Sequence, residues 1–307
     1  MNWSPFNPEF MTDPARGHQY LLNECPVHYC DMFEPPFYTL SRYGDVENAL
    51  RDIKTFSSHF GQGPRFTEPA GMLCDPPQHT QYRKLIQQAF TPKAVAELRP
   101  MVVSLANKLV DDILAGERGF DLHDDLAFPL PVIIIAGMLG VPAEDLEDFK
   151  RWSDMQVELM GSEDPSQYVD EQTRFQAYMH AHMMSRRSLI ESGAEVPEDL
   201  LTLVASAKTD TGEYIPDGDA LSMLNQLLVG GNETTTSLIT NMIWRLLEVP
   251  SLWQEILDDE SLIGAAVEES LRFDPPVLGL YRNTTRSVEL HGQIIPEGSK
   301  VYINYAA

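Results

Sequence analysis

Gly230-Gly231-Asn232-Glu233-Thr234-Thr235-Thr236 interrupts a stretch that otherwise has the pattern of one long apolar helix. Leucines at helical spacing form an apolar stripe from Leu221 to Leu227, and the stripe resumes at Leu238. Between these points the stripe passes through Gly231 and Thr234, so large side chains are missing where they are due. The sequence therefore predicts a gap on one face of this helix.

The ends of this helix indicate where the gap lies. Asp217-Gly218-Asp219 is typical of a helix start, and Pro250 predicts the end. A helix of about 30 residues is roughly 45 Å long, which is enough to cross a whole domain. We therefore expect the gap near the centre of the fold.

The gap has two interpretations. Interior glycines often allow close helix packing, and threonine hydroxyls can bond to the carbonyl one turn earlier. Alternatively, the missing side chains admit a flat ligand or a small gas molecule, to which Thr234 presents a hydroxyl. Glu233 lies two residues from Gly231, so in a straight helix it points to roughly the opposite face. A role for Glu233 in proton delivery then requires a local bend, a water chain or a swing of the side chain.

Composition limits the class of protein. The 307 residues, 43% of them hydrophobic, are enough for one large domain, and we expect a single domain over 1–307. With 46 acidic and 22 basic residues the net charge is −24, which argues against nucleic acid or an anionic membrane as a partner. The first residues lack the basic and apolar segments of an export signal, so the sequence predicts a cytoplasmic protein.

Periodicity and capping patterns predict a mainly α fold with small β-sheets. The chain up to about Pro35 is expected to be irregular, and residues 57–73 form a loop long enough to suggest function. Short strands are expected at 37–41, 287–290 and 300–304. Helices are expected at about 77–90, 93–115, 132–140, 143–160, 164–192, 198–207, 219–249, 251–258 and 261–273.

Several cationic side chains lie at positions where they could bind an anion. His79 and Arg83 share a stripe with the apolar face of their helix, and Arg282 is a further candidate. They either bind a carboxylate or phosphate ligand or pair with protein carboxylates. Glu269 and Arg272 are three apart on a helix, a spacing that by itself usually indicates a surface ion pair.

Taken in order, these residues resemble the cytochrome P450 family of haem-thiolate monooxygenases in its soluble bacterial form. Gly230-Gly231-Asn232-Glu233-Thr234-Thr235 is similar to the family's oxygen-binding helix motif. The resemblance covers the chain from about Cys25 to Ala307. It implies the cytochrome P450 fold, haem b as cofactor, and insertion of one oxygen atom from O2 into a small organic substrate with electrons from a ferredoxin or similar donor.

The resemblance also implies roles for individual residues. Haem propionates are expected at His79, Arg83 and Arg282, and Glu269 with Arg272 is expected to be structural. Gly231 is expected to leave space for O2, Thr234 and Glu233 to deliver protons, and Val277 and Leu278 to line the substrate pocket together with the loop 57–73.

The family's cysteine ligand to the haem iron lies in a loop that would follow Ala307. We therefore expect a chain that is incomplete at its C-terminus, contains no metal ligand and is inactive as given. Cys74 is not expected to replace the missing ligand, because it lacks the glycine-rich flanks of the family's loop. The alternative is a non-catalytic helical protein that binds haem or another ligand.

Overall fold

A computed structural model describes residues 3–116, 119–162 and 164–307. The chain divides into two compact units, which are described one at a time. The sheet unit comprises Met1–Pro69, Leu73–His79 and Glu268–Ala307, and the helical unit comprises Ala70–Met72 and Thr80–Val267. The single domain expected from the sequence stays a prediction.

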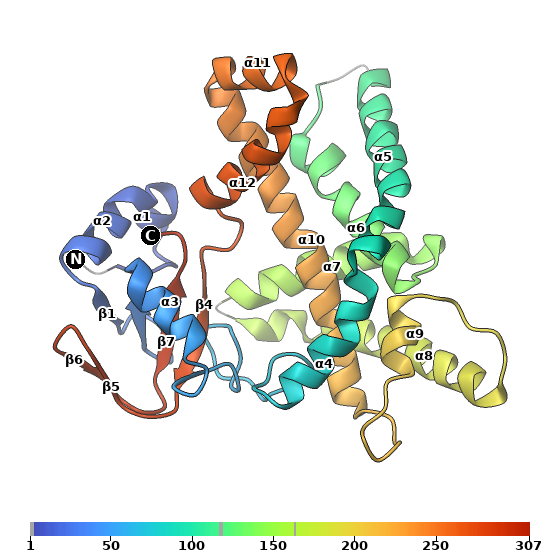
Figure 1. Cartoon of the computed structure of the whole chain (residues 1–307), viewed down its shortest axis with the longest axis horizontal. Helices are drawn as coiled ribbons and strands as arrows, with labels where there is room; N and C mark the ends of the chain where they lie inside the picture. Colours follow the sequence, from blue (N-terminus) through green and yellow to red (C-terminus); the bar gives the residue numbers. More distant parts are fainter. Residues whose placement is uncertain (1–2, 117–118, 163) are drawn as a thin grey trace. The chain divides into compact units, whose positions relative to one another are not determined.

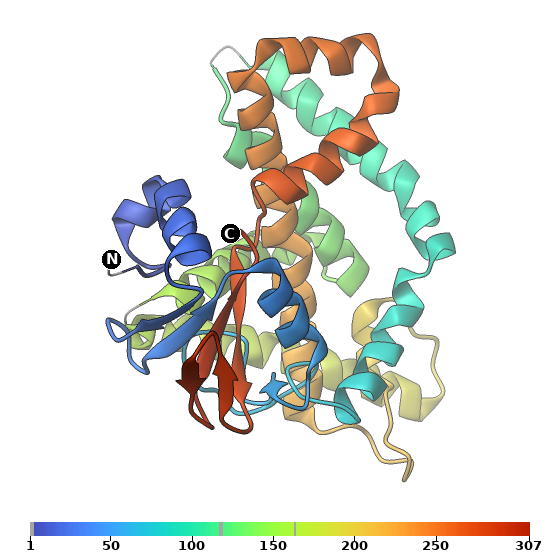
Figure 2. The same ribbon diagram turned by 60° about the vertical axis from the view of Figure 1, so that its left-hand side comes forward.

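The sheet unit is built on a sheet that joins the two ends of the chain. Figure 2 shows N-terminal strands in blue beside C-terminal strands in red. The order is β1-β2-β7-β4-β3, in which β2 and β7 are parallel and the other pairs antiparallel. The strands are β1 (Val27–Cys30), β2 (Phe37–Leu40), β3 (Phe56–Ser57), β4 (Gly279–Thr284) and β7 (Lys300–Asn304).

A separate hairpin pairs β5 (Val288–Leu290) with β6 (Gln293–Ile295). Its turn consists of His291 and Gly292, and both have positive φ values, 51° and 75°. A two-residue turn with positive φ at both positions matches the twist of antiparallel strands. The strand expected at 287–290 therefore belongs to this hairpin.

Two apolar clusters cover the sheet, and the alternation of side chains along β7 separates them. Val301 and Ile303 belong to one cluster, whereas Tyr302 between them belongs to the other. Successive side chains of a strand point to opposite faces, so each face of the sheet has its own core. α3 (Tyr43–Arg51) contributes Ala49 to the first cluster.

The expectation of an irregular N-terminal region was wrong. Residues before Pro35 form α1 (Pro8–Thr12), α2 (Pro14–Asn23) and β1. Each helix has proline as its first residue, and the Asn7 side chain caps α1 by accepting the N–H of Glu9 at 3.0 Å. Proline suits the first helical turn because its missing N–H has no intrahelical partner there. In the sequence the same prolines resemble turn signals.

The helical unit confirms the mainly α prediction. Its helices are α4 (Gln78–Gln87), α5 (Pro92–Ala115), α6 (Pro129–Leu139), α7 (Leu146–Gly161), α8 (Val169–Ser192), α9 (Leu200–Ala205), α10 (Asp217–Glu248), α11 (Pro250–Asp258) and α12 (Ile263–Phe273). The first residues of α4 and the last residues of α12 belong to the sheet unit. A π-helical turn, η2 (His123–Ala127), precedes α6.

α10 is the 32-residue helix that the sequence predicted, and it is drawn in orange in Figure 1. Within its unit it packs against η2, α6, α7 and α9. The end of the loop 57–73 is attached to its first turns, because the N–H of Gly71 donates to Asp219 Oδ1 at 2.8 Å and the N–H of Met72 donates to Gln226 Oε1 at 2.9 Å. Among the described residues, no helix combines the length and apolarity needed to cross a bilayer.

Candidate functional site

The two adjacent glycines of α10 have different surroundings. A Cβ atom added to Gly231 would lie 2.8 Å from Cγ1 and 2.9 Å from Cδ1 of Ile135 on α6, so Gly231 allows close helix packing. A Cβ atom added to Gly230 would meet nothing within 4 Å. The space that the sequence assigned to Gly231 therefore lies at Gly230. Neighbouring helix positions differ by about 100° in direction, and the sequence does not reveal which of them faces α6.

Thr234 lies on the same face of α10 as Gly230, one turn further along. Its hydroxyl donates to the Gly230 carbonyl at 3.0 Å. This is the backbone bond considered in the packing interpretation, yet it also fixes the hydroxyl beside the open position. Gly230 and Thr234 thus form a patch with no large side chain and one polar hydroxyl, which we call the open face of α10.

Asn232 points away from the open face and joins α10 to α7. Its side chain is fully buried, and Nδ2 donates to the buried Ser153 hydroxyl at 2.7 Å. Oδ1 accepts the Thr236 hydroxyl at 3.3 Å, so the buried amide has partners at both ends. Neither Asn232 nor Ser153 was predicted as a site residue. The available signal was that polar Asn232 follows Leu224 and Leu228 at four-residue spacing along α10.

The half-buried carboxyl of Glu233 is held by the same amide, since Asn232 Nδ2 donates to Glu233 Oε1 at 3.3 Å. Burial raises the pKa of Glu233, the negative charge of Asp154 raises it further, and His123 acts in the opposite direction. Glu233 lies three residues from Gly230, hence about 60° around the helix. The sequence predicted that Glu233 points to roughly the opposite face from Gly231. Relative to Gly230 and the open face, it does not.

The predicted propionate ligands are divided between the units. Arg83 of the helical unit is exposed and forms no hydrogen bond or ion pair within the described residues. Arg282 of the sheet unit donates from Nη1 to the Tyr281 carbonyl at 2.9 Å, and its positive charge opposes the rise that burial causes in the pKa of Tyr305. In the part of the chain that the structure describes, no carboxylate pairs with Arg282. Half-buried His79, also in the sheet unit, donates its backbone N–H to the Asp75 carbonyl at 3.2 Å.

Asp75 lies just before the helix of His79, and its carboxylate is bonded within the sheet unit. Its Oδ1 accepts the backbone N–H of Ser58 at 2.9 Å, and its Oδ2 accepts the hydroxyl of Ser57. The carboxylate therefore fastens the start of the loop 57–73 within the sheet unit.

Glu269 and Arg272 form a bidentate ion pair, with Nε to Oε2 at 2.8 Å and Nη2 to Oε1 at 2.6 Å. The hydrogen bonds from Arg272 lower the pKa of Glu269. Both side chains are exposed, by 60% and 68%, within their unit. Of the predicted pocket residues, Val277 is half-buried and Leu278 is exposed, and the Leu278 carbonyl accepts the N–H of Tyr305 at 2.8 Å.

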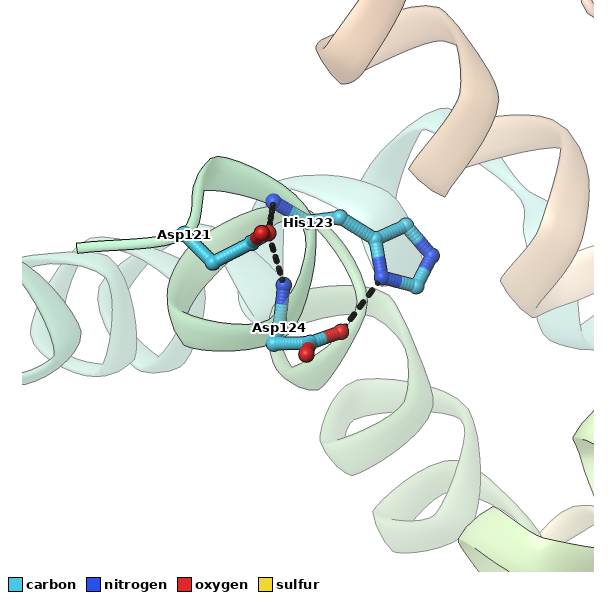
Figure 3. A group of neighbouring side chains, drawn as sticks. All are labelled: Asp121, His123 and Asp124. Atoms are coloured by element: carbon cyan, nitrogen blue, oxygen red, sulfur yellow. Dashed lines mark hydrogen bonds and ion pairs between the residues drawn. The ribbon is translucent and has the colours of Figure 1, made fainter.

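The thiols and the possible metal ligands lie elsewhere. Cys30 is part of an apolar cluster of the sheet unit, Cys74 is buried, and none of the three cysteines forms a disulfide within the described residues. Within the described residues, the group with metal-ligand atoms close together is Asp121, His123 and Asp124, shown in Figure 3. Asp121 Oδ1 accepts the N–H groups of His123 at 2.8 Å and Asp124 at 3.1 Å, so this carboxylate serves as a helix cap.

Comparison with known proteins identifies the family. The cytochrome P450 family model matches residues 18–307. A putative cytochrome P450 of Bacillus subtilis is 32% identical over 94% of this chain and 72% of its own length. The erythromycin C-12 hydroxylase of Saccharopolyspora erythraea is 37% identical over 83% of this chain, and the chain spans 64% of that enzyme.

The fold agrees with this match. The solved structure of cytochrome P450 CYP109Q5 from Chondromyces apiculatus superimposes with a TM-score of 0.83 at 34% identity, over 98% of this chain and 75% of that protein. The resemblance inferred from the residues is therefore confirmed by sequence and by fold. The chain belongs to the cytochrome P450 family of haem-dependent monooxygenases.

Proposed function

We propose that this P450 inserts one oxygen atom of O2 into a small apolar organic substrate, with electrons from a ferredoxin-type donor in the cytoplasm. The observation that carries this proposal is the open face of α10, where Gly230 leaves space and Thr234 holds a hydroxyl. Haem, when bound, supplies the iron that activates O2. The chain's own residues bind the cofactor, leave room for the small reactants and handle protons.

The residues present fit haem. A flat apolar group needs a helix face without large side chains, and the open face offers one. Its two propionates need cationic partners, and Arg83 and Arg282 have no carboxylate partner among the described residues of an acidic chain. We propose that Arg83, Arg282 and His79 bind the propionates through charge-assisted hydrogen bonds.

Thr234 is proposed to pass protons at the open face. Its hydroxyl donates to the Gly230 carbonyl, and the hydrogen can be redirected by rotation about the Cβ–Oγ1 bond. Glu233 is proposed to supply protons to the Thr234 hydroxyl. Since Asn232 holds Oε1 of Glu233 on the α7 side, the side chain must swing to reach the hydroxyl. Burial raises the pKa of Glu233, which favours its protonated form more than that of an exposed carboxyl.

We propose that none of the three cysteines in residues 1–307 is the thiolate ligand of the iron. Cys30 is packed in the apolar core, and Cys25 Sγ lies 3.6 Å from the Val27 carbonyl and 3.7 Å from His28 Nδ1. Buried Cys74 lies between Leu73 and Asp75, so it lacks the glycine-rich flanks of the family's ligand loop. Without another thiolate these residues would bind haem without turnover.

Val277, Leu278 and the loop 57–73 are proposed to form substrate-binding surface, because they offer apolar side chains and a loop fastened at both ends. One relative is, by its name, a hydroxylase that acts on erythromycin. The apolar character of Val277 and Leu278 favours an apolar substrate for this chain.

The test is Thr234→Ala in the haem-loaded full-length protein, with the neighbouring Thr235→Ala as control. Thr235 is exposed and lies about 100° from Thr234 around the helix. We expect Thr234→Ala to raise several-fold the share of reducing equivalents lost as hydrogen peroxide, and Thr235→Ala to leave it unchanged. Equal coupling in all three proteins would refute the role of Thr234. Haem binding without any O2 consumption would favour the non-catalytic binding protein instead.

A further inference from the structure

Lys300 is a buried lysine of the sheet unit whose ammonium group is bonded to the loop 57–73. It is the first residue of β7 and is only 1% exposed. Its Nζ donates to the backbone carbonyls of Phe60 at 2.9 Å, Gly61 at 3.3 Å and Gly63 at 3.1 Å. An ammonium group has three N–H donors, so this one side chain fixes the loop at three points.

The first part of the loop forms a tight turn around this ammonium group. The N–H of Thr67 donates to the Phe60 carbonyl at 3.2 Å, which closes the turn. Gly61 has a φ of 85°, and a Cβ atom there would collide with the Thr67 hydroxyl, so glycine is needed at this position. The carbonyl of Gln62 accepts the N–H of Tyr281 on β4 at 2.9 Å. The carbonyls of the turn are therefore bonded to the sheet.

Side chains of the same turn form one wall of a cavity. The rings of Phe60 and Phe66 meet edge to face at 6.3 Å between centroids, and the two residues remain 45% and 47% exposed. Both line a cavity of about 710 Å³ within the sheet unit. Nζ of Lys300 lies 4.9 Å from the centroid of the Phe66 ring and attracts it. The described lining contains two acidic residues, Glu68 and Glu297, and no basic one, so the cavity suits an apolar molecule without negative charge.

The ammonium group is costly where it lies. Burial lowers the pKa of Lys300 to about 8, and within the described residues no carboxylate forms an ion pair with it. An apolar side chain of similar length would avoid the cost of removing this charge from water. The three bonds to the loop therefore matter for the shape of the loop more than for the stability of the sheet.

We propose that Lys300 is a positioning residue for substrate binding, which holds Phe60 and Phe66 as one wall of a site for a neutral apolar organic molecule. This inference rests on the proposed function of the loop 57–73. Lys300 acts through the backbone carbonyls of the loop and does not itself contact the substrate. Without the ammonium group these carbonyls turn to water, and the two rings lose their fixed positions. Ordering them again costs part of the binding energy, so the affinity for substrate falls.

The test compares Lys300→Met with Val301→Ala in the haem-loaded full-length protein. Methionine keeps the length of the side chain and removes the ammonium group. Val301, the next residue of β7, belongs to the apolar cluster on the opposite face of the sheet, so its truncation weakens β7 without removing a bond to the loop. Tryptic cleavage after Arg65, identified by fragment mass, measures opening of the loop. Fluorescence titration with Nile red, a neutral apolar dye, measures binding.

We expect Lys300→Met to raise both the cleavage rate and the Kd for Nile red several-fold. Val301→Ala should lower the urea midpoint but leave cleavage and Kd unchanged. Equal effects of the two variants on Kd would overturn the inference, because any weakening of β7 would then be sufficient. Lys300→Gln, which also lacks the ammonium group, should change cleavage and Kd in the same direction and keeps the test valid should Lys300→Met fail to fold.

Phe66→Ala separates this inference from the proposed function of the loop. It removes part of the cavity wall and should raise the Kd for Nile red while Lys300 keeps its bonds. If Phe66→Ala raises the Kd and Lys300→Met does not, the loop binds apolar molecules as proposed and the inference about Lys300 fails. If the wild-type protein does not bind Nile red, or if neither variant changes the Kd, the proposed role of the loop in substrate binding fails as well.

Discussion

Replacing each of the two adjacent glycines of α10 by alanine should change stability in opposite directions. Alanine favours a helix interior over glycine by about 0.5–1 kcal/mol. At Gly230 the added methyl group meets nothing within 4 Å, so Gly230→Ala should raise the free energy of unfolding by about that amount. At Gly231 the same methyl group would lie 2.8 Å and 2.9 Å from side-chain carbons of Ile135.

Ile135 has little freedom to move away from that methyl group. It is 4% exposed and lies on α6. Overpacking of a buried site costs about 1–3 kcal/mol, so Gly231→Ala should lower the free energy of unfolding by roughly 0–2.5 kcal/mol after the helix preference is included. The two variants should therefore differ by roughly 1–3 kcal/mol.

Urea unfolding of both variants, and of each combined with Ile135→Ala, measures this difference. Alanine at 135 removes Cγ1 and Cδ1, so the cost of Gly231→Ala should disappear in that background, while the effect of Gly230→Ala should be unchanged. Equal stabilisation by Gly230→Ala and Gly231→Ala, with no coupling to Ile135, would show that the assignment of the open face to Gly230 is wrong.

Two further predictions concern buried polar groups of the sheet unit. Burial lowers the pKa of Lys300 from 10.5 to about 8, although three backbone carbonyls accept its ammonium group. The unfolded chain binds this proton more tightly, so the free energy of unfolding should rise between pH 8 and 10.5 by at most about 3 kcal/mol. Denaturation measured at a series of pH values should show this rise, and Lys300→Met should abolish it. The buried Tyr281 hydroxyl has no partner within the described residues, so Tyr281→Phe should leave the stability unchanged or raise it by about 1 kcal/mol. The melting temperature measures this, and a lower melting temperature would reveal a partner.

The long elements were predictable because their signals are redundant. α10 combines an acidic start, a terminal proline and an apolar stripe over 32 residues, so no single ambiguous position changes the prediction. The first two helices were missed because they are short and begin with Pro8 and Pro14, which a sequence equally offers as turn residues. A helix is thus predicted more safely from a long apolar pattern than from a single proline or capping residue.

The sequence offers the candidate site as a motif but not as a geometry. The roles of the motif residues stay predictions, and the direction of each side chain depends on which neighbour packs against α10. Ile135 decides between the two glycines, and Ser153 decides where Asn232 and Glu233 point. Both partners lie at least 79 positions away in sequence, and a single sequence taken alone contains no signal for such pairings.

The most direct test of whether the open face of α10 lies over the haem iron is the infrared stretching frequency of carbon monoxide bound to the reduced full-length protein. The stretch responds to polar groups beside the bound ligand. It should shift when Thr234→Ala removes the hydroxyl and when Gly230→Ala adds a methyl group, and it should stay unchanged in Thr235→Ala. An identical frequency in all four proteins would contradict the placement of Gly230 and Thr234 at the iron.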